Sequence, residues 1–213
     1  MAAIQISLTV EESKLLLAHA LKQDDRLQKV WQSGRLCLLG GSTVSALAEI
    51  LGFAPLRLCG RVDPSGCRTA LQDAQAYDNI LIENGQARDL AETEEDIVSL
   101  VDRLTEKDLV VISGNAFDAM GRAVIAYGFP GGGPRGKAIA KIAAKEIPTI
   151  LLFGLEKFVP SLEESLSVAA DFQETDFAMG MAISLAPLKG DLFTELDAFS
   201  SLFNLQAYVL TSG

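Results

Sequence analysis

Short apolar runs that alternate with helix-like segments are the feature that most constrains the fold of this chain. Residues 108–113 and 149–153 form two such runs, and residues 35–39 form a third. A continuous apolar run of this length is typical of a strand that is covered on both faces. Because helix-like segments separate the runs, the pattern predicts a mostly parallel sheet with helices on both faces, a three-layer Rossmann-like α/β fold.

Local signals predict further elements around these strands. Thr9 and Glu12 form a capping box, so a helix should begin there and run to Gly34. The other predicted helices are 44–51, 93–104, 119–127, 137–145 and one that Ser161 caps. The other predicted strands are 56–59, 79–83, 181–185 and 206–210, and a helix at 191–202 separates the last two. The predicted loops are 60–68, 114–118 and 128–136.

The length and composition favour a single folding unit. The chain has 213 residues, of which 49% are hydrophobic, and this is enough for one sizeable core. We therefore expect a single α/β domain over residues 1–213. Its tail, residues 175–213, should either extend the sheet or form a small strand–helix–strand lobe.

Charge and hydropathy exclude several classes of partner and site. The net charge is −10, from 28 acidic and 18 basic residues, and this opposes binding to nucleic acid. No apolar run reaches the ~18 residues of a membrane span, and no signal peptide is evident. We therefore expect a cytoplasmic protein without membrane association. Neither a cofactor nor a metal is predicted, because Cys37, Cys59, Cys67 and His19 lack metal-ligand spacing.

The first candidate binding loop follows the strand 35–39. It consists of Gly40, Gly41, Ser42 and Thr43, and a predicted helix follows it. In parallel sheets, ligands bind at the carboxyl ends of the strands, where such loops lie. Glycines permit a close backbone approach, and a helix start supplies free N–H groups for a phosphate or carboxylate. The alternative is an ordinary turn in which a hydroxyl caps the helix.

The second candidate loop is a glycine run with two cations. Its residues are Gly131, Gly132, Gly133, Arg135 and Lys137. Together with Gly136, the run satisfies most of a Walker A pattern, but Ala138 stands where that pattern needs a hydroxyl for magnesium. We therefore interpret the run as an anion-binding loop rather than the site of a nucleotide hydrolase. The alternative is a mobile glycine loop without a ligand.

Two further groups of polar residues lie near predicted strand ends. Asn115 and Asp118 follow the strand 108–113, where they either contact a ligand or serve as turn and helix-cap residues. Arg57, Arg61 and Arg68 surround the predicted strand 56–59. They form either an anion site or a set of solvated, salt-bridged side chains.

Two blocks of the sequence, residues 33–51 and 107–160, resemble the ribose-5-phosphate isomerase family. That family is grouped with glucosamine-6-phosphate deaminases, CoA transferases and sugar-sensing regulator domains. The first block is similar to the family's strand, Gly-Ser-Thr phosphate loop and helix. The second is similar to its apolar strand, glycine run, helix, strand and Ser-Lys segment. The resemblance implies that Gly40–Thr43, Gly131–Gly133 and Lys157 bind the ligand.

The family's catalytic positions do not match in this chain. Its Gly-Ala-Asp motif is replaced at residues 113–116, its lysine before the glycine run corresponds to Pro130, and its catalytic glutamate corresponds to Ile139. Isomerisation of an aldose to a ketose needs a carboxylate base, and Ile139 cannot serve as one. Glu156, beside Lys157, and Asp118 are the carboxylates that could replace it.

Three classes of function follow from these observations. The first, which we favour, is a protein that binds a small sugar phosphate or CoA-like anion without isomerase chemistry. The second is an enzyme on the same fold whose acid or base is Glu156 or Asp118. The third is an assembly protein whose glycine loops make subunit contacts. A homo-oligomer, most simply a dimer, is expected in every case.

Overall fold

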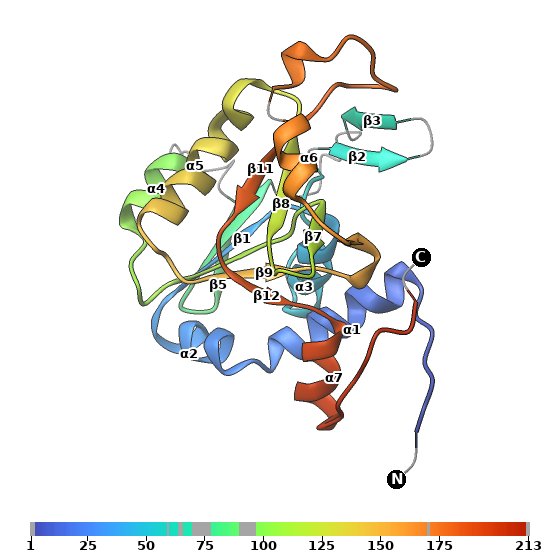
Figure 1. Ribbon diagram of the computed structural model, residues 1–213. Helices are drawn as coiled ribbons and strands as arrows, with labels where there is room; N and C mark the ends of the chain where they lie inside the picture. The colour runs from blue at the N-terminus through green and yellow to red at the C-terminus, as the bar shows by residue number, and fades with distance from the viewer. Residues whose placement is uncertain are drawn as a thin grey trace.

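A six-stranded mixed sheet forms the centre of the molecule (Figure 1). The computed structural model describes residues 3–58, 60–63, 66–69, 78–89, 97–169 and 171–211. The strand order is β12-β9-β6-β1-β4-β5. In chain order the strands are β1 (Arg35–Leu39), β4 (Asn79–Glu83), β5 (Gln86–Asp89), β6 (Leu109–Ile112), β9 (Thr149–Leu152) and β12 (Asp191–Phe193).

The central sheet is mixed, so the prediction of a mostly parallel sheet was wrong. β1, β6, β9 and β12 run parallel to one another, but β4 runs antiparallel to both of its neighbours. One of these two antiparallel pairs is a tight hairpin between β4 and β5. Asn84 and Gly85 both have positive φ, 52° and 72°. This is the backbone that an Asn-Gly pair supplies to a two-residue hairpin turn.

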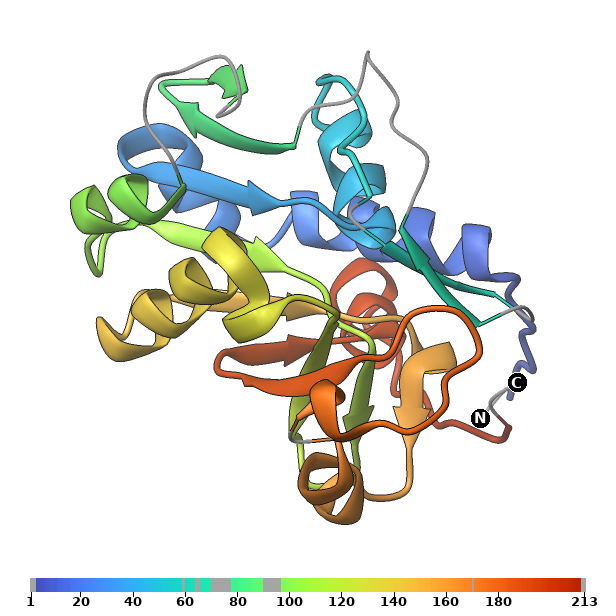
Figure 2. The same cartoon turned by 90° about the horizontal axis from the view of Figure 1, so that it is seen from above.

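Helices pack on both faces of this sheet. Their bounds are α1 (Val10–Lys22), α2 (Asp25–Ser33), α3 (Ser42–Ile50), α4 (Ile97–Arg103), α5 (Gly133–Ala144), α6 (Glu163–Val168) and α7 (Glu195–Phe203). Alternate residues of one strand belong to different cores: Leu38 packs in a core with α1, α2, α3 and α7, while Leu39 packs in a core with α4 and α5. α4 and α5 lie side by side (Figure 2).

A second, four-stranded sheet replaces two predicted elements. Its order is β10-β7-β8-β11. The strands are β7 (Ala116–Asp118), β8 (Ala123–Tyr127), β10 (Phe158–Val159) and β11 (Ser184–Leu188). The predicted loop 114–118 therefore contains a strand, and the predicted helix 119–127 is largely a strand. β8 pairs with β11 over five residues, a partner that lies about 60 residues further along the chain.

Other differences from the predictions have local causes. The predicted helix 9–34 is two helices, because Asp24 accepts a hydrogen bond from the Arg26 N–H and begins α2. Residues 60–69 form a hairpin of β2 (Gly60–Asp63) and β3 (Gly66–Thr69) rather than a loop. Within the described residues, 56–58 and 206–210 form no strand, and Cys59 and Thr93 lie outside that description.

The C-terminal part of the chain extends the central sheet. β12 is its edge strand and lies within the predicted helix 191–202, which is therefore shortened to α7. Thr194 and Asp197 form a capping box at the start of α7. None of the helices described is long and apolar enough to cross a membrane.

Candidate functional site

The carboxyl ends of four parallel strands meet at one edge of the central sheet. β1 is followed by Gly40 and Gly41, β6 by Ser113, β9 by the turn that carries Lys157, and β12 by Glu195. Because these strands are parallel neighbours, the residues that follow them share one side of the molecule. Two of these residues, Ser113 and Lys157, are joined directly.

Lys157 is the cation at this edge. Its Nζ donates a hydrogen bond to Ser113 Oγ at 2.9 Å and lies 5.4 Å from the centre of the Phe153 ring. Burial lowers the pKa of the Lys157 ammonium below its usual range, against the attraction of Glu156 and Glu195, and the positive charge of Lys14 lowers it further. Among the described residues, Lys157 forms no ion pair.

Glu195 fixes the turn that positions Lys157. Its side chain is buried at the start of α7, and its two carboxylate oxygens accept hydrogen bonds from the Leu155 N–H at 3.1 and 3.0 Å. The same carboxylate accepts a hydrogen bond from the Ser13 hydroxyl of α1. The carboxylate therefore joins the end of β9 to α1 and α7. Sequence reasoning missed both Glu195 and Lys14, because neither lies in a recognisable motif.

The loop after β1 is held tightly by its neighbours. The Gly40 N–H donates to Asn79 Oδ1 at 3.1 Å, and the Gly40 carbonyl accepts from the Arg135 guanidinium. A Cβ on Gly40 would lie 2.6 Å from the Asp78 carbonyl oxygen and 2.7 Å from that of Arg57. Gly40 is therefore enclosed by backbone, and it serves close packing here.

The start of α3, next along the chain, has hydrogen-bond donors without a side-chain cap. A Cβ on Gly41 would have Ser113 Cβ as its nearest neighbour, at 3.9 Å. Gly41 is the N-cap of α3, and no side chain caps that end. The first N–H groups of a helix have no partner within the helix. Thr43 is fully buried, and its hydroxyl has no hydrogen-bond partner within the described chain.

The glycine run lies at the start of α5. Gly131, Gly132 and Gly133 have φ values of 63°, 69° and 61°, a left-handed backbone that favours glycine. Arg135 reaches the carbonyl of Gly40, so the structure does bring the two predicted glycine loops together. Lys137 is exposed on α5.

Asn115 and Asp118 serve the second sheet. Asn115 Oδ1 accepts a hydrogen bond from the Ala126 N–H at 2.8 Å, across the hairpin of β7 and β8. Asp118 begins the turn of that hairpin rather than a helix. Its carboxylate accepts hydrogen bonds from three backbone N–H groups, those of Met120, Arg122 and Leu162, and from the Arg122 guanidinium at 2.8 Å.

The hydrogen bonds to Asp118 also set its charge state. Burial opposes ionisation of the carboxyl, but the Leu162 and Arg122 hydrogen bonds outweigh it and hold its pKa below the usual range. An ionised carboxylate whose oxygens are already engaged is an anchor for the turn. Glu156, the other candidate acid, lies next to Lys157 and folds its carboxylate against Gly154.

Arg57 and Arg68 lie in different environments. Arg57 forms an ion pair with Asp78 at 3.0 Å, whereas Arg68 is exposed on β3. The side chain of Arg61 lies outside the description. Ile139, the residue that the resemblance sets against a catalytic glutamate, packs against the core beneath α5.

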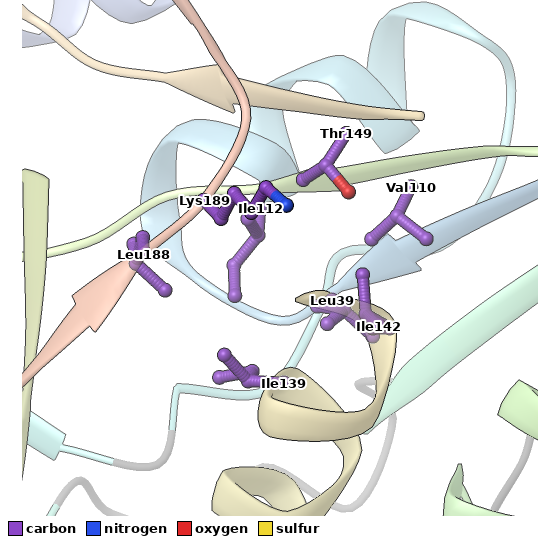
Figure 3. Close-up of a pocket in the computed structure, with 8 residues that line it drawn as sticks. All are labelled: Leu39, Val110, Ile112, Ile139, Ile142, Thr149, Leu188 and Lys189. Atoms are coloured by element: carbon purple, nitrogen blue, oxygen red, sulfur yellow. The ribbon is translucent and has the colours of Figure 1, made fainter. Parts of the chain in front are cut away.

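Two cavities accompany these elements. The larger, about 390 Å³, is a groove between α1 and α3 that is bordered by Lys14 and Ser42. The smaller, of about 10 Å³, lies between α5 and the sheet (Figure 3) and is lined mainly by apolar side chains. It holds at most a single water molecule. The described residues contain no cluster of metal-ligating side chains.

Comparisons of this chain with protein-family models, curated proteins and solved structures found no match. The fold and the site define an α/β protein with a half-buried lysine at the carboxyl ends of its parallel strands.

Proposed function

We propose that this chain binds a small phosphorylated anion, of the sugar-phosphate or CoA type, at the carboxyl edge of its central sheet. The observation that carries the proposal is the half-buried ammonium group of Lys157, which feels the charges of Glu156 and Glu195 but forms no ion pair with a carboxylate within the described residues. A cation in such surroundings is unfavourable unless an anion meets it. A phosphate oxygen beside Ser113 would supply that anion.

The start of α3 supports the same ligand. Its first N–H groups have no side-chain cap, and free N–H groups at a helix start favour phosphate. Gly41 leaves room for a close approach, because its missing Cβ would meet only Ser113 at 3.9 Å. The site therefore combines a cation from β9 with neutral donors from the loop after β1.

We also propose that the chain shares the fold of the protein group that its sequence resembles. β1, its Gly-Gly-Ser-Thr loop and α3 form the strand, turn and helix expected of that group, and helices cover both faces of the sheet as in a three-layer Rossmann-like fold. Isomerase chemistry is disfavoured, because Ile139, at the position that the resemblance gives to the catalytic glutamate, has no carboxylate to act as a base. A cytoplasmic location and a homodimer stay predictions.

One alternative has an observation in its favour. Glu156 lies beside Lys157, so a carboxylate and an ammonium could act together on a bound substrate. Asp118 does not share this position, because its oxygens are occupied in the β7–β8 turn. Glu156→Gln separates binding from catalysis: on the binding proposal it leaves ligand affinity intact, whereas an enzyme would lose turnover.

A thermal-shift panel tests the proposal, with pentose and hexose phosphates, CoA, acyl-CoAs, and ATP with and without magnesium. A ligand at 100 times its dissociation constant adds about 2.7 kcal/mol to the free energy of unfolding. Lys157→Met should abolish the shift, and Lys189→Met, an exposed lysine paired with Glu146, is the matched control. An unchanged shift in Lys157→Met, or no shift with any phosphate, contradicts the proposal.

A further inference from the structure

The groove between α1 and α3 lies beside the proposed anion site. Ser42 is the first residue of α3 and borders the groove. Lys14 of α1 also borders it, and its charge acts on Lys157. Ser42 is joined through Gly41 to the surroundings of Ser113, which holds Lys157. The groove therefore lies next to the surroundings of the anion site, at Lys14 and Ser42.

The groove wall carries both apolar and polar side chains, and Ser45 and Glu49 of α3 line it beside Ala46 and Ile50. Ser42, Ala46 and Ile50 all line it and are spaced four residues apart, so they lie on one face of the helix. At a rise of 1.5 Å per residue, this face is about 12 Å long. Leu56 and Leu58 add apolar surface on the far side, and Leu15 adds it from α1.

The charges at the groove favour a head group at the Lys157 end. Lys14 forms an ion pair with exposed Glu11 at 2.7 Å. Because the two opposite charges cancel, this pair contributes little net charge. Glu49 lies further along α3 and contacts the Ser45 hydroxyl at 3.3 Å. Of the two described lysines at the groove and the anion site, Lys14 forms an ion pair and Lys157 does not. A ligand's negative charge is therefore best placed beside it, with its uncharged part in the groove.

We propose, resting on the anion site above, that the ligand is an amphiphilic phosphate. Its head group binds between Lys157 and the start of α3, and an aliphatic tail lies in the groove along Ala46 and Ile50. The groove volume of about 390 Å³ falls within the range of small-molecule sites. A hydroxylated sugar would leave this apolar wall without a complementary partner, whereas a hydrocarbon chain would cover it.

A homologous series of alkyl phosphates tests this inference. Dissociation constants are measured calorimetrically for inorganic, methyl, butyl and hexyl phosphate, on the full chain. Each added methylene that enters the groove should tighten binding by about two- to fourfold. Ala46→Trp fills the groove and should remove this dependence on chain length while leaving inorganic phosphate affinity unchanged. Leu15→Gln, at a half-exposed position on α1, weakens the same wall with little risk to folding.

The outcomes separate this inference from the anion site itself. The groove is supported as the tail site if affinity rises with alkyl chain length in the unmodified protein, and if this rise is lost in Ala46→Trp and reduced in Leu15→Gln. Binding of inorganic phosphate with no dependence on chain length overturns the groove and leaves the anion site standing. A dependence that persists in both variants means that the tails bind elsewhere, and this also overturns it. Failure of every phosphate to bind overturns the anion site and the groove together.

Discussion

Gly40 and Gly41 are adjacent glycines in one loop, and the structure predicts a large loss of stability when alanine replaces Gly40 and little change when it replaces Gly41. A Cβ at Gly40 would lie 2.6 and 2.7 Å from two backbone carbonyl oxygens, those of Asp78 and Arg57. Contacts that short must open by several tenths of an ångström on two sides. Neither oxygen can move without its strand or loop, so Gly40→Ala also strains the hydrogen bond to Asn79.

The size of the effect follows from these contacts. Overpacking in a closed site costs about 1–3 kcal/mol, and loss of a hydrogen bond adds about 1 kcal/mol, so we expect Gly40→Ala to cost about 3 kcal/mol. For a chain of this length, that corresponds to a fall of roughly 6–12 °C in Tm.

Gly41→Ala is the matched control for this substitution. Its φ is 166°, an extended backbone that any residue adopts, and its nearest neighbour would be 3.9 Å away. A weaker N-cap and a less flexible unfolded chain offset each other to within about 1 kcal/mol. Urea and thermal unfolding of both variants measure the difference. Equal stabilities for Gly40→Ala and Gly41→Ala would refute the packing role assigned to Gly40.

Three further predictions concern individual side chains. Burial raises the pKa of Cys37 to about 12, so at pH 8 a thiol reagent should label half-exposed Cys67 in preference to Cys37, as peptide mass spectrometry would show. Asp118→Asn should lower Tm without changing phosphate affinity, and equal Tm values would contradict its anchoring role. Lys157→Met should raise stability at neutral pH, because the depressed pKa means that the unfolded chain holds this proton more tightly. That gain, measured by urea unfolding, should shrink as the pH rises from the depressed pKa toward 10.5.

Part of the fold could be predicted because local sequence patterns specify it. The strands β1, β6 and β9 are continuous apolar runs, and both of their faces are covered, as such runs predict. β8 was predicted as helix because a short apolar run fits either element. Its adjacent Val124 and Ile125 favour a strand, but its partner β11 comes only after residue 180, and no local signal announces that pairing.

The candidate site, like the fold, could be predicted only in part from local sequence patterns. The sequence placed Gly41 and Thr43 after one strand and Lys157 after another, and the structure brings these two strand ends to one edge. Lys14 and Glu195 could not be found in this way. They reach the site because α1 packs against α3 and α7, an arrangement set by tertiary packing rather than by spacing along the chain.

The most direct test of the central claim is the titration of the Lys157 side chain by NMR, with and without phosphate. The resonance of its Cε would be assigned by its absence in Lys157→Met. In the free protein, the pKa of Lys157 should lie below 10.5, and phosphate should raise it, because an anion beside the ammonium stabilises the charged form. A lowered pKa that phosphate leaves unchanged would mean that no anion binds beside Lys157, and the proposed site would be wrong.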